Sequence, residues 1–177
     1  MLYGIGIVAR ALSVYRRRAQ EPEGEANRTA APKAKYGMCL EAVGLFLAFF
    51  QRPAGHPDWL NWIALAAGLA SALFGLWAIR ELGMQWRVQA VVTKHHKLVT
   101  SGPYAIVRNP VYTSLLGMLI SSGLIFSSAV FTAIGVTIYL VGTEIRVREE
   151  ERLLEGKFGK EFDAYRASVP AYLPFMR

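Results

Sequence analysis

Cysteine is almost absent from this sequence: Cys39 is the single cysteine in 177 residues. One thiol excludes an internal disulfide framework and any metal site built from several cysteines. We expect Cys39, which lies in an apolar run, to be a small packing residue. The chain also lacks a G-x-G-x-x-G turn of the dinucleotide-binding kind. We expect no secretory signal, because the first basic cluster follows the apolar part instead of preceding it.

Apolar residues, in contrast, make up 53% of the chain and occur in blocks. The blocks are residues 36–50, 59–79, 111–126 and 129–141. About 20 helical residues cross a hydrocarbon core, a length that only the second block reaches alone. The last two blocks, separated by Ser127 and Ser128, need flanking residues or form a tight helical hairpin. The first block is marginal, and its Glu41 must face the bundle interior or lie near an end.

The positive charge of the chain is distributed unevenly between these blocks. The formal net charge of +7 suits nucleic acid or an anionic membrane surface, and the apolar blocks favour the membrane, so we expect no nucleic-acid partner. Of the 20 lysines and arginines, 19 lie in residues 10–35, 80–108 and 146–177. Four spans place these regions on one side, which the positive-inside rule makes cytoplasmic. The sequence therefore predicts an all-α polytopic integral protein of the inner (cytoplasmic) membrane, with both termini and any cofactor pocket facing the cytoplasm.

Two further segments flank the predicted spans. Residues 1–35 read as an interfacial amphipathic helix (1–15) and a basic linker, with a fifth short span as the alternative for the helix. Residues 36–177 form the membrane domain. In the tail, from Glu144 to about Tyr165, apolar residues recur at helical spacing. We expect this tail to be an amphipathic helix that packs back onto the 80–110 loop.

Several polar clusters are candidates for chemistry. His95 and His96 are adjacent and would point about 100° apart on a helix, so we predict no metal site. Asn109 precedes Pro110 and is a natural N-cap for the third span. Arg146 and Glu150 are four residues apart and share a helix face, so they either pair with each other or hold a charged ligand.

Two tyrosines, Tyr104 and Tyr112, flank the Asn109-Pro110 pair. The sequence allows two interpretations of these tyrosines. They are either tyrosines of the membrane interface or part of a polar pocket.

Taken together, the stretches HKLVTSGPYAIVRNPVY, RVREEERLL, FGKEFDAY and VPAYLPF resemble the isoprenylcysteine carboxyl methyltransferase family. That family belongs to a wider membrane group with the phospholipid N-methyltransferases. The resemblance covers about residues 85–176. It implies a membrane methyltransferase that holds S-adenosylmethionine without a Rossmann fold. It also implies a lipophilic acceptor that enters from the bilayer lipid, such as an isoprenoid or prenylcysteine carboxylate, or a lipid amine.

The resemblance also implies roles for individual residues. Arg146 corresponds to an arginine at the acceptor end of the family's site and is the expected catalytic residue. The expected cofactor-binding residues are Gln89, His96, Lys97, Leu98, Val99, Tyr104, Asn109, Pro110, Val111, Tyr112 and Glu150. One departure is Asn109, where the family pattern has histidine, because asparagine cannot act as a general base. An NADPH-dependent membrane reductase and a non-catalytic member of the fold are the alternatives.

Overall fold

The protein is described by a computed structural model that covers residues 29–30, 33–50, 57–83, 91–92 and 97–172. Its helices are α2 (Ala34–Leu47), α3 (Asp58–Leu82), α4 (Pro110–Phe126), α5 (Ala129–Phe158) and α6 (Lys160–Ser168). A short 3-10 helix, η2 (Gly102–Ala105), precedes α4. Two-residue strands β1 (Thr29–Ala30) and β2 (Val91–Val92) pair antiparallel. The predicted helical architecture is confirmed for this part of the chain, whereas the predicted interfacial helix 1–15 lies outside it.

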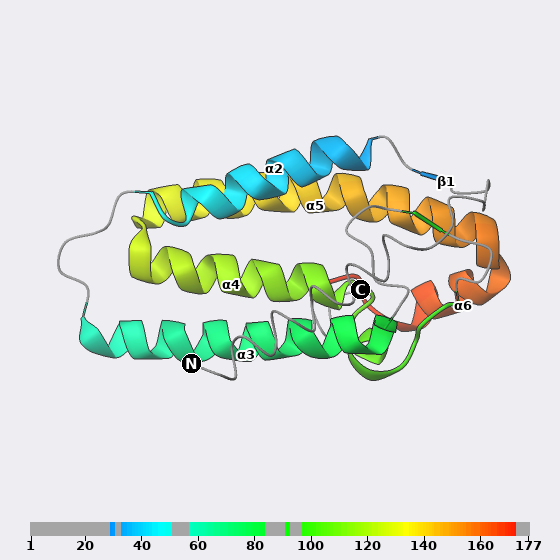
Figure 1. Cartoon of the computed structure of the whole chain (residues 1–177), viewed down its shortest axis with the longest axis horizontal. Helices are drawn as coiled ribbons and strands as arrows, with labels where there is room; N and C mark the ends of the chain where they lie inside the picture. The colour runs from blue at the N-terminus through cyan, green and yellow to red at the C-terminus, as the bar shows by residue number, and fades with distance from the viewer. Residues whose placement is uncertain (1–28, 31–32, 51–56, 84–90, 93–96, 173–177) are drawn as a thin grey trace, which may run out of the picture.

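The four long helices lie side by side in the order α2, α5, α4, α3 and alternate in direction (Figure 1). The start of α2, the end of α3, the start of α4 and the end of α5 therefore meet at one end of the bundle, where α6 also lies. The polar clusters of the sequence belong to these ends. The fold thus collects them in one place.

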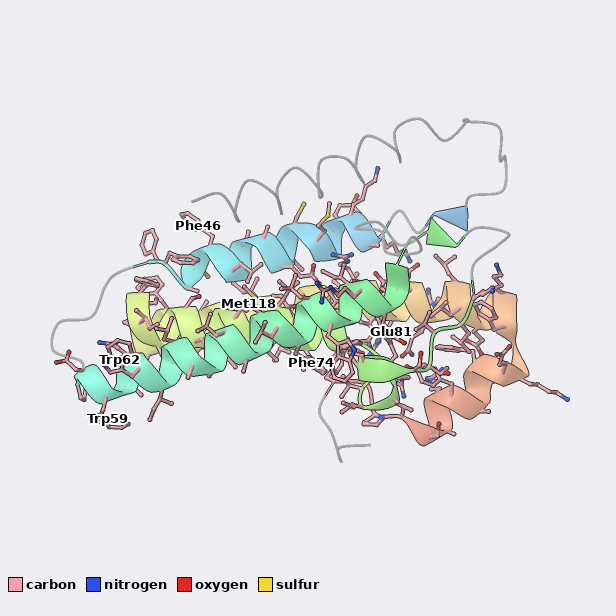
Figure 2. All side chains as sticks on the ribbon, turned by 60° about the horizontal axis from the view of Figure 1, so that its bottom comes forward. Phe46, Trp59, Trp62, Phe74, Glu81 and Met118 are labelled. Atoms are coloured by element: carbon pink, nitrogen blue, oxygen red, sulfur yellow. The ribbon has the colours of Figure 1, made fainter. Side chains whose placement is uncertain are left out.

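The outer surface of the bundle is apolar. Figure 2 shows Phe46 on α2 and Trp59 and Trp62 on α3 projecting away from the other helices, and all three side chains are exposed. Such a surface is typical of lipid contact. By length and composition α3 and α5 can each cross a membrane, while α4 is a shorter apolar helix. The number of spans and the cytoplasmic location of the termini stay predictions.

The prediction for Cys39 was wrong, because its side chain is exposed on α2.

The predicted hairpin between the last two apolar blocks is confirmed. Helix α4 ends at Phe126, and Ser127 and Ser128 have extended backbones; the Ser128 hydroxyl then accepts a hydrogen bond from the Phe131 amide at 3.4 Å. The tail from Glu144 to about Tyr165 is helical, as predicted, but its first part continues the last apolar helix. Helix α5 runs through that residue without interruption, because nothing in the sequence breaks it before Gly159.

The amphipathic tail is divided at Gly159 instead. This residue has φ of +51°, a conformation that glycine adopts without steric cost. The shorter helix α6 follows and buries Phe162 and Tyr165. The predicted packing of the tail onto the loop is confirmed by the hydrogen bonds described below.

Helices α2 and α5 approach each other closely through glycines. A Cβ on Gly37 would lie 2.5 Å from the Gly142 carbonyl oxygen, and a Cβ on Gly142 would lie 2.6 Å from the Gly37 oxygen. Gly44 and Gly135 repeat this contact two turns along each helix. Small residues at such interfaces let helix backbones touch in membranes. The contact also brings Glu41, one turn after Gly37, against the middle of α5.

Candidate functional site

Arg146 is a buried cation at the meeting point of α2, α4 and α5. Its Nη1 atom lies 2.8 Å from Oε2 of Glu41, and its Nη2 atom lies 3.5 Å from Oε1 of Glu150. The guanidinium carbon is 5.1 Å from the centre of the Tyr112 ring. Arginine retains its charge when buried, and two carboxylates with an aromatic face compensate the lost hydration. We call Glu41, Tyr112, Arg146 and Glu150 the arginine cluster.

Tyr112 joins the first turn of α4 to this cluster. Its hydroxyl donates to Oε1 of Glu150 at 2.6 Å. Its backbone carbonyl accepts a hydrogen bond from the Tyr139 hydroxyl at 2.9 Å. Pro110, buried at the first position of α4, needs no hydrogen-bond partner for a backbone N–H, so the helix can begin here at no cost. Tyr112 is therefore buried in a polar cluster and is not exposed as an interface tyrosine would be.

The turn before α4 is anchored to the end of α3. Gly102 has φ of +58°, and a Cβ at this position would lie 3.1 Å from the carboxyl group of Glu81. The Ser101 hydroxyl donates to the same carboxylate at 2.5 Å. The positive φ favours glycine here, and a Cβ would also require the Glu81 carboxyl group to move slightly. Glu81 lies at the end of α3 opposite to Trp59 (Figure 2).

Tyr104, in η2, is buried next to the arginine cluster. Its carbonyl accepts a hydrogen bond from the Tyr165 hydroxyl at 2.7 Å. Burial raises the pKa of Tyr104 above its ordinary value, and the neighbouring Tyr165 and the negative charges of Glu150 and Glu81 raise this pKa further. The phenol therefore stays protonated at neutral pH, and the field of Glu150 reaches it.

The chain after α6 forms a strap, residues 169–172, across the start of α4. The Arg108 amide donates to the Pro170 carbonyl at 2.8 Å, and the Thr113 hydroxyl donates to the Tyr172 carbonyl at 2.8 Å. The Arg108 side chain donates to the Val169 carbonyl at 2.6 Å. These bonds join the C-terminal strap to the turn before α4 and to the first turn of that helix.

Asn109 occupies the N-cap position of α4, but its side chain does not cap the helix. The side-chain amide instead donates to the Ala171 carbonyl at 3.1 Å, and the Asn109 backbone amide donates to the same oxygen at 3.1 Å. The predicted capping role was wrong, because the strap supplies a carbonyl acceptor that the sequence did not place. A histidine N–H can donate a bond of the same kind.

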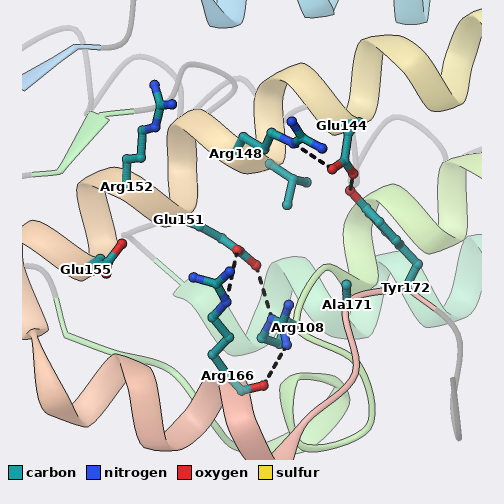
Figure 3. Close-up of a pocket in the computed structure, with 10 residues that line it drawn as sticks. Arg108, Glu144, Arg148, Glu151, Arg152, Glu155, Arg166, Ala171 and Tyr172 are labelled. Atoms are coloured by element: carbon teal, nitrogen blue, oxygen red, sulfur yellow. Dashed lines mark hydrogen bonds and ion pairs between the residues drawn. The ribbon is translucent and has the colours of Figure 1, made fainter. Parts of the chain in front are cut away.

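A charged cavity of about 430 Å³ lies beside the strap (Figure 3). Glu151 accepts from Arg108 at 3.1 Å and lies 3.8 Å from Arg166, while Glu144 accepts from Arg148 and Tyr172, each at 2.8 Å. The carboxylates of Glu144 and Glu151 are thus already paired with neighbouring side chains. None of the predicted cofactor residues that the structure describes lines this cavity, and the cavity residues that belong to α5 lie on a different face of that helix from Arg146 and Glu150.

The other predicted site residues are distributed around the same end of the bundle. Lys97 is exposed, and Leu98 and Val99 are half-buried in the loop before η2. Val111 is half-buried in the first turn of α4. Gln89 and His96 lie outside the described residues. The described part of the chain contains no group of three or more metal-ligating side chains.

Sequence reasoning missed the partner of Arg146 on α2. The signal was present, because Glu41 is the one charged residue in its apolar block and was expected to face the interior. It is 5% exposed, as expected. Its partner lies 105 residues along the chain, however, and no helical period connects the two.

Residues 62–156 match the sequence model of the isoprenylcysteine carboxyl methyltransferase (ICMT) family. The matched stretch is more than half of the chain and includes Tyr104, Tyr112, Arg146 and Glu150. The chain belongs to the ICMT family. Glu41 and the strap lie outside the part that matches the family's sequence model.

Relatives of this ICMT-family chain include bacterial and animal proteins. It is 30% identical over 122 residues to the nickel-cobalt-cadmium resistance protein NccN of Alcaligenes xylosoxydans xylosoxydans, covering 68% of this chain and 56% of the relative. It is 30% identical over 126 residues to the protein-S-isoprenylcysteine O-methyltransferase of Rattus norvegicus, covering 67% of this chain and 43% of the relative. The chain thus spans about half the length of these relatives.

The fold agrees with that of a solved family structure. The eukaryotic intramembrane Ras methyltransferase ICMT is similar with a TM-score of 0.63 and 25% sequence identity, over 82% of this chain and 53% of that chain. The ICMT-family assignment therefore rests on both sequence and fold, and it accounts for a membrane protein built from apolar helices.

Proposed function

We propose that this ICMT-family protein transfers a methyl group from S-adenosylmethionine to the carboxylate of a lipophilic acceptor, such as a prenylcysteine, at the membrane face. The observation that supports this most directly is the arginine cluster, where a buried guanidinium, a carboxylate and a tyrosine hydroxyl meet. The same residues match the family pattern. The reductase alternative gains no support from the family membership.

The cluster suits S-adenosylmethionine chemically. When bound, this cofactor supplies a methyl group activated on a positively charged sulfonium. Glu150, whose side chain is 28% exposed, can accept a charge-assisted hydrogen bond from the cofactor's ammonium group. Tyr104 and Tyr112 provide aromatic surface beside it. The remaining proposed contacts are Gln89, His96, Lys97, Leu98, Val99, Asn109, Pro110 and Val111.

Arg146 suits the acceptor. A guanidinium has only hydrogen-bond donors, arranged as a fork that matches a carboxylate, so it favours a carboxylate acceptor over a lipid amine. The burial of Arg146 keeps water away from the acceptor carboxylate and strengthens this attraction. The apolar surface of the helices gives a lipid tail access from the bilayer.

Asn109 is compatible with this reaction. An α-carboxyl group has a pKa of about 3.5 and is already ionised at neutral pH. Its methylation therefore needs no general base, and a residue that cannot accept a proton is no obstacle at position 109. Orientation and desolvation by Arg146 and the surrounding side chains supply the catalysis.

The first test is calorimetric binding of S-adenosylmethionine and S-adenosylhomocysteine to the purified protein in detergent. We expect binding in the wild type and a loss of at least about tenfold in affinity for Glu150→Gln. Glu155→Gln is the matched control, because Glu155 is an exposed carboxylate on the same helix. Absence of binding in a folded sample, or equal losses in both variants, would contradict the proposal.

A second arm separates an enzyme from a non-catalytic member of the fold. The protein is incubated with N-acetyl-S-farnesylcysteine and methyl-labelled S-adenosylmethionine, and the labelled methyl ester is counted. The corresponding amide, which lacks the carboxylate, is the negative control. Cofactor binding without ester formation from any lipophilic carboxylate would favour the non-catalytic alternative.

A further inference from the structure

Glu41 holds Arg146 more firmly than Glu150 does. Both oxygens of Glu41 are engaged, Oε2 by Arg146 at 2.8 Å and Oε1 by the Thr143 hydroxyl at 3.1 Å. The side chain of Glu41 is 6% exposed. A buried carboxylate with two donors cannot turn away without leaving a charge unpaired, which is costly.

Glu150 is the weaker and more accessible partner. Its distance to Nη2 of Arg146 is 3.5 Å, and the oxygen involved already accepts the Tyr112 hydroxyl at 2.6 Å. Its side chain is 28% exposed, compared with 6% for Glu41. The two ion pairs therefore differ: Nη1 makes the shorter contact, to a carboxylate that is almost fully buried, and Nη2 makes the longer one, to a carboxylate that is partly exposed.

The backbone of α2 supports this arrangement. A Cβ on Gly37 would lie 2.6 Å from Cγ of Arg146, so the helix touches the aliphatic stem of the arginine. Gly142, one turn before Arg146, packs against the same segment of α2. The stem and one nitrogen of Arg146 are thus both restrained by α2, a helix outside the stretch that matches the family model.

We propose that Glu41 is a positioning residue that fixes Nη1 of Arg146 and thereby sets the orientation in which the guanidinium meets the carboxylate of the acceptor. This inference rests on the proposed function. It makes α2 part of the site, although no residue of α2 belongs to the predicted cofactor set. Glu41 acts through Arg146 and need not contact either substrate.

The test compares wild type with Glu41→Gln, which preserves shape and removes charge. With N-acetyl-S-farnesylcysteine as the varied substrate, we expect KM to rise about tenfold, in the range of couplings between contacting residues. The affinity for S-adenosylhomocysteine, measured calorimetrically, should change by less than about twofold, since Glu150 and the tyrosines are intact. A purely structural role would instead weaken the binding of both the acceptor and S-adenosylhomocysteine, in parallel with a loss of stability.

A double-mutant cycle gives the decisive readout. In an Arg146→Gln background, Glu41→Gln should leave the KM for N-acetyl-S-farnesylcysteine unchanged, because the residue through which it acts is gone. Gly44→Ala is the matched structural control. Its Cβ would meet the Gly135 carbonyl oxygen at 2.6 Å, which disturbs the same helix pair without touching Arg146. It should lower the melting temperature and leave KM unaltered.

Thr143→Val provides a milder variant should Glu41→Gln fail to fold. It removes one donor to Glu41 and keeps the ion pair, so KM should rise by a smaller factor. Unchanged KM in a folded Glu41→Gln or Thr143→Val protein, or an equal effect of Glu41→Gln in both backgrounds, overturns the role of Glu41. Failure of the wild type to bind S-adenosylhomocysteine overturns the proposed function instead, so the two failures are distinguishable.

Discussion

The Tyr165 hydroxyl donates a hydrogen bond of 2.7 Å to the Tyr104 carbonyl, which ties α6 to the turn beside the arginine cluster. Tyr165 and Tyr104 are both buried, and they lie 61 residues apart in sequence. The tail of the chain is therefore a structural element of the site region.

Tyr165→Phe tests this tie. The substitution keeps the ring and leaves the Tyr104 carbonyl without this donor, which should cost about 1–3 kcal/mol in the free energy of unfolding. Thermal denaturation of the detergent-solubilised protein measures the loss. Tyr36→Phe is the control, because Tyr36 is 72% exposed and its change should be within about 0.5 kcal/mol. Equal melting temperatures for both variants would contradict the assignment.

Alkaline pH should destabilise the same region. Burial raises the pKa of Tyr165, Tyr104 and Tyr172 above the ordinary value of tyrosine. A group whose pKa is raised on folding contributes its stability below the unfolded value, about 10, and loses it as pH rises above that value. The melting temperature should therefore fall above about pH 10 and less steeply for Tyr165→Phe. Identical slopes for wild type and variant would exclude Tyr165 as a contributor.

Arg146→Gln should abolish most of the acceptor reaction. Removing one partner of a buried, hydrogen-bonded charge pair costs about 2–5 kcal/mol, so kcat/KM for N-acetyl-S-farnesylcysteine should fall about 30-fold or more. Arg148→Gln, two residues along the helix with its side chain 71% exposed, should change kcat/KM by less than about threefold. A turnover that survives in folded Arg146→Gln protein would remove Arg146 from the site.

The glycine contact between α2 and α5 makes a prediction about stability alone. Gly142→Ala places a Cβ 2.6 Å from the Gly37 carbonyl oxygen and should destabilise by at least about 1–3 kcal/mol through overpacking. Gly156→Ala, on the same helix with nothing within 4 Å of the added carbon, should stabilise by about 0.5–1 kcal/mol. Melting temperatures that move in the same direction would show that α2 does not pack as described.

Local patterns in the sequence were sufficient for much of this architecture. The apolar blocks predicted the long helices, Pro110 marked the start of α4, and the Ser127-Ser128 pair marked the hairpin. The four-residue spacing of Arg146 and Glu150 predicted their shared face, which the 3.5 Å contact confirms. Each of these features depends on neighbours within one or two helical turns, so the chain itself contains the information.

The sequence by itself thus determined the helices, their apolar character and the family to which the chain belongs. The tertiary structure alone decided that α2 packs on α5, that Glu41 reaches Arg146, and that the strap engages Asn109. The physical reason is that helical periodicity is local, whereas the pairing of helices depends on which faces fit when glycine backbones touch. A carboxylate in an apolar block predicts that a partner exists. The identity of that partner, which lies 105 residues away in the sequence, is decided by how the helices pack.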